Sequence, residues 1–253
     1  MLKILAARHH QGYRTFPYPK ELPSLPDRLR GRPKLDASRC PPDCKLCEEI
    51  CPTQAIRRTP QGLSLDLGRC LFCPACEQAC PTQAVQFTTE HRLATRRRED
   101  LQWDGREFAL ARQLDEACRR LFGRSLKLRQ VSAGGCNACE ADTNVLTTIG
   151  WDLGRFGIQF VASPRHADGL LITGPVSRNM ELALRKTYEA VPPPRLVIAV
   201  GACAIAGGPF MDSPQVLNGA AAVVPVDLFI PGCPPHPLTI LDGLLRLLGR
   251  LEK

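Results

Sequence analysis

The sequence contains no apolar run long enough to cross a membrane. Its longest apolar runs, 219–226 and 244–248, fall far short of the roughly 20 residues that a transmembrane helix needs. The first ten residues also lack the features of an export signal, namely a long apolar stretch, a small-residue cleavage site or twin arginines. We therefore expect a chain that works in the cytoplasm.

Aromatic residues are missing where the positive charge is densest. The formal net charge is +8, and segment 92–98 holds four arginines without an interleaved aromatic side chain. Surfaces that bind single-stranded nucleic acid combine basic grooves with aromatic platforms, so this absence disfavours nucleic acid as a partner. We expect the segment to be a solvated linker or a contact with another subunit.

Cysteine, by contrast, is abundant. Thirteen cysteines are unusual for a cytoplasmic chain, because glutathione and thioredoxin keep thiols reduced there and disulfides are rare. This number favours metal binding. Eight of the cysteines form two consecutive copies of one pattern, and each copy ends in Cys-Pro-Thr-Gln-Ala. The first copy has Cys40, Cys44, Cys47 and Cys51, and the second has Cys70, Cys73, Cys76 and Cys80.

The second copy has the C-x2-C-x2-C-x3-C-P spacing of bacterial ferredoxins. In that pattern three close cysteines hold one 4Fe-4S cluster and the fourth reaches the other cluster. The exchange predicts two ligand sets. They are Cys40, Cys44, Cys47 and Cys80 for cluster 1, and Cys51, Cys70, Cys73 and Cys76 for cluster 2. Three residues separate Cys40 from Cys44 where two are usual, which sets the geometry of cluster 1 apart.

Paired CxxC motifs also form structural zinc sites, so a zinc-binding structural or assembly protein is an alternative of another class. Zinc sites usually take two ligands from each of two knuckles. Here a pattern of three plus one repeats twice, with proline in the same place each time. The repeat therefore favours iron-sulfur clusters over zinc.

The second half of the chain alternates apolar runs with helical patterns. The runs 126–131, 195–200 and 223–230 are bounded by Gly and Pro, and the helical patterns cover 179–190 and 237–251. This alternation predicts a parallel sheet with helices on its faces. In such sheets the ligand site lies beyond the carboxyl ends of the strands.

The loops after the three expected strands carry four of the five remaining cysteines, so four thiols are able to converge at one edge of the sheet. These four are Cys136, Cys139, Cys203 and Cys233. The fifth, Cys118, falls on the apolar face of a helix that we expect over 107–122, with Gly123 at its end. We expect Cys118 to pack as a small hydrophobic residue and not to bind metal.

Several motifs around these cysteines carry a family resemblance. They are Gly-Gly-Cys136-Asn-Ala-Cys139-Glu140, Ser163-Pro-Arg-His-Ala-Asp168, Gly201-Ala-Cys203 and Pro231-Gly-Cys233-Pro-Pro235. This half resembles the small subunit of membrane-associated, energy-converting nickel-iron hydrogenases of the formate hydrogenlyase type, and the related subunit of respiratory complex I. The complex I subunit has two adjacent cysteines where this chain separates Cys136 from Cys139 by two residues, which favours the hydrogenase branch.

The upstream half resembles the separate two-cluster ferredoxin subunit of the same complexes. The resemblance includes the motifs Phe16-Pro-Tyr-Pro and Leu29-Arg-Gly-Arg-Pro33 ahead of the first cluster. The chain therefore resembles a fusion of two subunits. The expected fold class is α/β, a flavodoxin-like parallel sheet domain preceded by a bacterial 2x[4Fe-4S] ferredoxin-like α+β domain. The expected segments are an extended arm 1–34, a ferredoxin domain 35–90, a linker with an amphipathic helix 91–126, and a flavodoxin-type domain 127–253.

The resemblance also implies cofactors, partners and location. Cys136, Cys139, Cys203 and Cys233 would ligate a proximal cluster, which makes three 4Fe-4S clusters in all. The implied partners are a nickel-iron large subunit, integral membrane subunits, and an electron donor protein such as a ferredoxin or a formate dehydrogenase. The implied location is peripheral, on the inner face of the cell membrane. Three oxidised clusters with their thiolates would lower the net charge from +8 to about +2, so much of the basic excess compensates them.

The implied activity is that of an electron-transfer subunit with no catalytic residue of its own, which relays electrons to or from the nickel-iron site that turns over hydrogen. The alternative within redox proteins is an equivalent subunit of a complex I-like or hydrogenase-related quinone or ferredoxin oxidoreductase that lacks nickel. The family commonly has a carboxylate three positions after the second cysteine, usually Glu, and this chain has Asp142 there. The resemblance therefore carries no firm proton-transfer role to Asp142. Flavin binding is disfavoured because Cys136 to Glu140 fill the loop that cradles phosphate in flavodoxins. We assign His166 no metal role.

Overall fold

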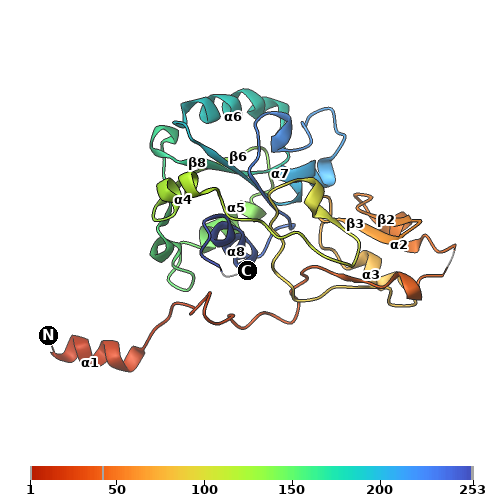
Figure 1. The fold of residues 1–253 in the computed structure, drawn as a ribbon, viewed down its shortest axis with the longest axis horizontal. Helices are drawn as coiled ribbons and strands as arrows, with labels where there is room; N and C mark the ends of the chain where they lie inside the picture. Colours follow the sequence, from red (N-terminus) through yellow and green to blue (C-terminus); the bar gives the residue numbers. More distant parts are fainter. Residues whose placement is uncertain (1, 42, 252–253) are drawn as a thin grey trace.

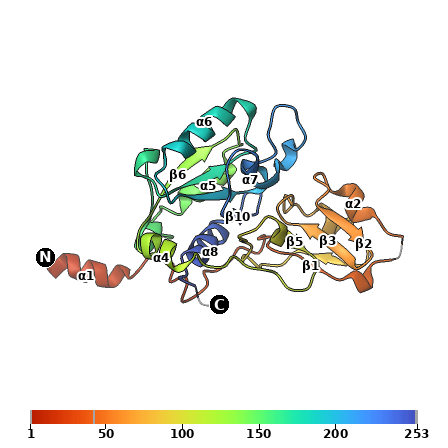
Figure 2. The ribbon, with the colours of Figure 1, turned by 45° about the horizontal axis from the view of Figure 1, so that its top comes forward.

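The computed structural model describes residues 2–41 and 43–251. Two parts lie side by side, and helix α1 (Leu2–Gln11) projects away from both of them (Figure 1). Helix α1 buries none of its residues. An irregular arm connects it to the smaller part, and Figure 2 shows the same arrangement from another direction. None of the helices described is long and apolar enough to cross a membrane.

The smaller part is built from short antiparallel strands and two short helices. Strand β1 (Lys34–Leu35) pairs with β4 (Val85–Gln86), and the hairpin of β2 (Ile56–Thr59) and β3 (Gly62–Asp66) is extended by β5 (Gln102–Trp103). The helices are α2 (Leu46–Ile50) and α3 (Ala75–Gln78), which contact each other. This is the ferredoxin-like α+β fold that the repeated cysteine pattern predicts.

The larger part contains the predicted parallel sheet, which has five strands where the sequence predicts three from its apolar runs. In spatial order they are β10 (Leu228–Ile230), β9 (Leu196–Val200), β8 (Gly169–Thr173), β6 (Leu126–Ser132) and β7 (Ile158–Phe160). Numbered along the chain, the order is 2-1-3-4-5, which is the flavodoxin-like order of doubly wound sheets. The strand order reverses between β6 and β8, and ligands bind at such a switch point.

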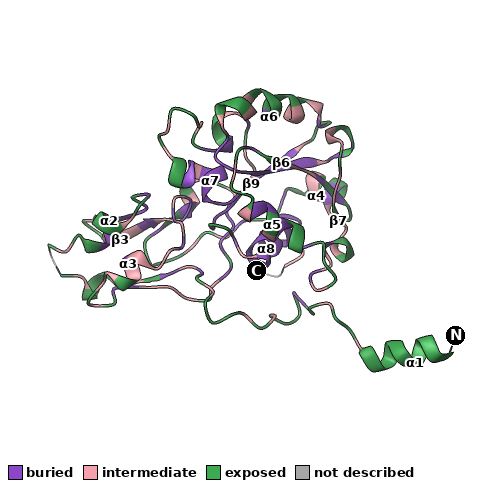
Figure 3. Cartoon of the chain, turned by 180° about the vertical axis from the view of Figure 1, so that it is seen from behind, coloured by how far each residue is buried: buried purple, intermediate pink, exposed green. Residues whose placement is uncertain are grey.

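Helices cover both faces of this sheet. Successive side chains of a strand point to opposite faces, and both sets are apolar in these strands, so both faces must be buried. Helix α6 (Arg178–Ala190) lies on one face, whereas α5 (Ala138–Val145) and α8 (Pro237–Leu247) lie together on the other (Figure 1). Within β8, Leu170 packs in the same cluster as Leu184 of α6, and Leu171 packs in the cluster of α8. Figure 3 shows that the strands and α8 are buried while α6 keeps an exposed outer face.

The segment expected to be a solvated linker is instead part of the fold. Thr95 pairs antiparallel with Phe229 of β10, with N···O distances of 3.0 and 2.9 Å. Arg98 makes two hydrogen bonds to Asp66 of β3, at 2.8 and 2.7 Å. Because its backbone and three of its four arginine side chains find partners within the chain, this run joins the two parts firmly.

The helix expected over 107–122 is much shorter than predicted. Helix α4 (Glu116–Phe122) begins after Asp115, whose carboxylate accepts a hydrogen bond from the Cys118 amide and caps the helix. The preceding residues are not helical because their amides bond elsewhere. Ala111 donates to the carbonyl of Ala94 at 2.7 Å, and Leu114 donates to that of Leu247 at 2.9 Å.

The arm that follows α1 is fixed to the larger part by a buried hydrogen-bond network. The Tyr18 hydroxyl donates to Asp242 of α8 at 3.0 Å, and Arg246 donates to the other carboxylate oxygen at 2.8 Å. Asp242 is 1% exposed. A buried carboxylate needs such partners, so the network holds the arm in one position against α8.

Candidate metal centres

None of the thirteen cysteines forms a disulfide within residues 2–41 and 43–251. Twelve of them form three groups of four, defined by hydrogen bonds and by electrostatic effects between neighbouring thiols. Thiols buried together are costly to ionise unless a positive charge balances them, which a metal cluster provides.

The first group joins the start of the first cysteine copy to the end of the second. The Cys40 thiol has the thiols of Cys44 and Cys80 as its neighbours. Burial is the main reason that the pKa of Cys40 is raised, Arg58 opposes the rise, and the two neighbouring thiols add to it. Burial also raises the pKa of Cys47 to about 11, with a further contribution from Cys40. The members of this group are those that the spacing predicts for cluster 1.

The second group joins the first three cysteines of the second copy to the last cysteine of the first copy. Burial raises the pKa of Cys70, and the thiols of Cys76, Cys51 and Cys73 raise it further. Burial raises the pKa of Cys76 to about 12, again with contributions from Cys51 and Cys73. All four side chains line one small cavity. The structure therefore brings together the four cysteines predicted for cluster 2.

The third group lies at the carboxyl ends of the strands of the parallel sheet. Cys136 and Cys139 follow β6, Cys203 lies on α7 (Ala202–Ala206) after β9, and Cys233 follows β10. Burial raises the pKa of Cys139, and Cys203 adds to the rise. Burial raises the pKa of Cys203 to about 12, with further contributions from Cys233 and Cys136. Cys136 and Cys233 are exposed, so one side of this group faces the surface.

The second group is adjacent to both of the others. The Cys47 thiol of the first group contributes to the raised pKa of Cys76 in the second. The Cys73 thiol of the second group contributes to the raised pKa of Cys233 in the third, across the junction of the two parts. Phe72, which precedes Cys73, lines the same cavity as Cys233.

The two cysteine copies repeat the same hydrogen bonds around their fourth cysteine. An amide donates to sulfur at 3.2 Å in both copies, from Ala55 to Cys51 and from Ala84 to Cys80. The intervening Thr hydroxyl lies 3.8 or 3.7 Å from the same sulfur. Burial acts to raise the pKa of Cys80, but these hydrogen bonds outweigh it and lower the pKa. Such bonds favour the thiolate, the form that binds iron.

Glycines give the third group its space. A Cβ at Gly201 would lie 2.5 Å from the Cys139 sulfur, and a Cβ at Gly208 would lie 2.6 Å from the Cys203 sulfur. Both glycines have positive φ, 92° and 57°, which other residues rarely adopt. The backbone therefore leaves the sulfurs unobstructed. Four thiols gathered in this way suit a 4Fe-4S cluster, which is held by four cysteine thiolates.

The sequence reasoning did not identify a buried carboxylate beside the third group. Glu140 is 6% exposed, and its Oε1 accepts hydrogen bonds from Ser132 and Thr173, each at 2.6 Å. Its position directly after Cys139 was visible in the sequence. The two hydroxyl partners were not, because Thr173 lies 33 positions away on another strand.

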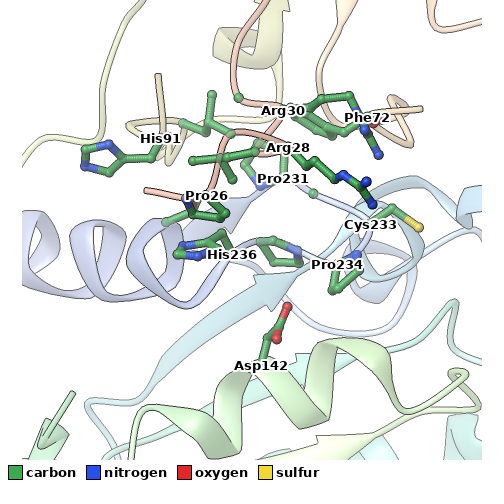
Figure 4. Close-up of a pocket in the computed structure, with 16 residues that line it drawn as sticks. Pro26, Arg28, Arg30, Phe72, His91, Asp142, Pro231, Cys233, Pro234 and His236 are labelled. Atoms are coloured by element: carbon green, nitrogen blue, oxygen red, sulfur yellow. Dashed lines mark hydrogen bonds between the residues drawn. The ribbon is translucent and has the colours of Figure 1, made fainter. Parts of the chain in front are cut away.

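Asp142 faces a cavity of about 290 Å³ between the two parts. The carboxylate points from α5 towards Pro234 and His236, with Arg28 on the far side (Figure 4). Cys233 of the third group also lines this cavity. Burial raises the pKa of Asp142. His166, in contrast, is exposed at the end of a short turn on the larger part.

Cys118 lies outside all three groups. It is half-buried on α4, packs against the apolar cluster of α8, and has the charged side chains of Asp115 and Asp227 as its neighbours. We predict that Cys118→Ala leaves the iron content unchanged and lowers the free energy of unfolding by less than about 1 kcal/mol, since little buried volume is lost. Iron analysis and chemical denaturation of both chains test this. Loss of a cluster signal would show that Cys118 is a ligand.

Comparison with known protein families matches both parts of the chain. Residues 136–247 match the family described as the NADH ubiquinone oxidoreductase, 20 Kd subunit. Residues 31–84 match the 4Fe-4S dicluster domain. The two matched regions contain all three cysteine groups.

Three curated relatives show the range of similarity. The chain is 40% identical over 144 residues to the probable membrane-bound hydrogenase subunit mbhJ of Pyrococcus furiosus, which covers 57% of this chain and 86% of the relative. It is 44% identical over 130 residues to formate hydrogenlyase subunit 7 of Escherichia coli, covering 51% of each. It is 48% identical over 103 residues to a subunit of the NADH-quinone oxidoreductase of Rubrobacter xylanophilus, covering 40% of this chain and 41% of the relative. The chain thus spans about half the length of the Escherichia coli relative and less than half the length of the Rubrobacter xylanophilus relative.

Proposed function

The chain belongs to the family of the NADH ubiquinone oxidoreductase 20 Kd subunit, and we propose that it relays electrons between an external redox partner and the nickel-iron site of a partner large subunit. It is an electron-transfer subunit of the hydrogenase-related and complex I-like oxidoreductases, and it carries a 4Fe-4S dicluster domain on the same chain. The proposal adds the nickel-iron partner, three clusters, and the twelve cysteine ligands.

The adjacency of the three cysteine groups carries this proposal. The Cys73 thiol lies close enough to Cys233 to contribute to its raised pKa, although the two residues belong to different parts of the chain. When bound, 4Fe-4S clusters take up and release single electrons. The chain holds each cluster by four thiolates, donates hydrogen bonds to sulfur, and limits the access of water. The exposed side of the third group, at Cys136 and Cys233, is where we place the large subunit.

The location and the other partners belong to the same proposal. The relatives include a subunit of a hydrogenase described as membrane-bound. We propose that this chain lies on the inner face of the cell membrane, against integral membrane subunits of the same complex. The donor, a ferredoxin or a formate dehydrogenase-like protein, would meet the first cysteine group, which belongs to the 4Fe-4S dicluster domain.

Iron analysis provides the direct test of the cluster count. We expect about twelve irons per chain after anaerobic purification and reconstitution, as three clusters of four, with little zinc. The twelve grouped thiols are the reason. About eight irons in a chain with all its loops intact would mean that one ligand set is misassigned. Zinc in place of iron would support the structural alternative.

The zinc alternative has little support in the geometry. A zinc ion needs four ligands at about 2.0–2.3 Å from one point. Among the described residues, no three His, Cys, Asp or Glu side chains converge in this way. The ligands of a cluster instead bind four different irons and stand farther apart.

The second candidate is an equivalent subunit of a complex that lacks nickel and acts on quinone or ferredoxin. The identity of 48% to a subunit of an NADH-quinone oxidoreductase is the observation that favours it. Nickel analysis of the complex purified with this chain separates the two candidates. Stoichiometric nickel in the large subunit would support the first, and its absence from an intact complex would support the second.

A further inference from the structure

The first loop of each cysteine copy differs in the hydrogen-bond donors that its backbone has. In the second copy, the amide of Phe72 donates to the sulfur of Cys70, two residues earlier, at 3.3 Å. The corresponding position in the first copy, two residues after Cys40, is Pro42, and Pro41 precedes it. Proline has no amide hydrogen. The first loop therefore cannot make the bond that the second one makes.

A side chain from β2 supplies a donor at this place. The Nη1 atom of Arg58 donates to the Cys40 sulfur at 3.4 Å and also to the carbonyl oxygen of Pro41. The amide of Arg58 itself donates to the carboxylate of Glu48, on α2 of the same cysteine copy. One residue thus contacts a proposed ligand, the widened loop after it, and the helix that follows.

We propose that the Arg58 guanidinium replaces the missing amide donor of the first loop and raises the reduction potential of the cluster at Cys40, Cys44, Cys47 and Cys80. This inference rests on the proposed function, because it requires a 4Fe-4S cluster at that place. It adds a positioning residue that the repeated motif does not contain.

The direction of the effect follows from charge. Reduction adds one negative charge to the cluster, and hydrogen bonds to the sulfurs are among the factors that set its potential. A hydrogen bond from a cation to a thiolate is stronger than one from a neutral amide, and it strengthens as negative charge accumulates. Arg58 therefore stabilises the reduced state more than the oxidised state.

The neighbouring arginine provides a matched control. Arg57 is also exposed on β2, but successive side chains of a strand point to opposite faces. Arg57 accordingly lines a hollow with Arg69 and Gln102, whereas Arg58 lines another hollow with Cys40. Substitution of either arginine removes one positive charge from the same strand, but only Arg58 touches a proposed ligand.

The test is a redox titration of the full chain, followed by electron paramagnetic resonance. The signal of the first cluster is identified as the one that is lost in Cys44→Ser. In Arg58→Gln we expect its reduction to become about tenfold less favourable, which is about 59 mV more negative for one electron. We expect Arg58→Lys to give an intermediate value, because it keeps the charge without the planar fork. Arg57→Gln should match the wild type.

Each outcome separates this inference from the function on which it rests. An unchanged potential in Arg58→Gln, or an equal shift in Arg57→Gln, would overturn the role of Arg58. If Arg58→Gln does not retain the cluster, the test is made with Arg58→Lys. A reduction potential of the first cluster in Arg58→Lys equal to that of the wild type would overturn the proposal. If Cys44→Ser removes no signal from the wild-type spectrum, the ligand set is wrong, and the proposed function fails at this cluster.

Discussion

Replacing Cys203 with serine is expected to abolish hydrogen turnover, the activity that we propose for the assembled complex, with every electron donor. Cys203 is buried on α7 and lies among the other three thiols of the third group. Serine would offer a harder oxygen ligand where iron-sulfur chemistry prefers thiolate. Mutation of a residue that only orients a metal ligand lowers metal affinity or activity by about 10–100-fold. We therefore expect loss of a ligand itself to lower the turnover by more than about 100-fold.

The matched variant is Cys73→Ser, in the neighbouring group. It should lose turnover that is coupled to the physiological donor, because the relay is interrupted before the third group. It should keep appreciable activity with a small viologen dye, because such a dye needs no docking site on the first group and can pass electrons to the third group directly. Co-purification with the large subunit shows that both variants assemble. Coupled turnover at the wild-type rate in an assembled Cys203→Ser complex would remove the third group from the path.

Replacing Gly201 with alanine is expected to remove one whole cluster without changing any ligand. The added methyl group would lie 2.5 Å from the Cys139 sulfur, and the backbone has φ +92°, which alanine rarely adopts. The amide of Gly201 is fixed by a 2.9 Å hydrogen bond to Ile230, so the loop has little freedom to retreat. We expect the iron content to fall from about twelve to about eight per chain.

The control for this substitution is Gly154→Ala in the same part of the chain. A Cβ at Gly154 would meet only the Asp152 side chain, at an ordinary contact distance of 3.8 Å. Its iron content should equal that of the wild type. A Gly201→Ala chain that retains all its iron and its third cluster signal would show that the Cys139 sulfur is not fixed where the structure has it.

The sequence was sufficient to predict the features that depend on local spacing. The repeated cysteine pattern predicted which thiols lie together in the smaller part, because three cysteines of a short loop surround one point and the fourth, beyond the loop, reaches the other group. The apolar runs before Cys136, Cys203 and Cys233 predicted parallel strands, since strand ends of a doubly wound sheet meet at one edge. The third run was longer than the strand that forms, β10, which begins only at Leu228.

Features that depend on partners far apart in the chain could not be predicted. The pairing of Thr95 with Phe229 joins positions that have no common local pattern. The hydrogen bond from Tyr18 to Asp242 spans 224 positions. Arg58 resembled any other charged residue of an exposed strand until its contact with Cys40 was known. Each of these contacts is set by packing of the whole chain, which periodicity does not describe.

The bridge between Thr95, in segment 92–98, and the edge strand β10 affects how the two parts of the chain exchange electrons. A flexible tether would give the two parts only a millimolar effective concentration, so each transfer between them would wait for a chance encounter. Here Thr95 is paired with Phe229 of β10, and Arg98 is hydrogen-bonded to Asp66 of β3. The two parts are therefore held in contact, and no encounter between them is needed. The pair also has a stoichiometry of one to one by construction, whatever the levels of synthesis. Evolution of either part is therefore constrained by the shape of the other.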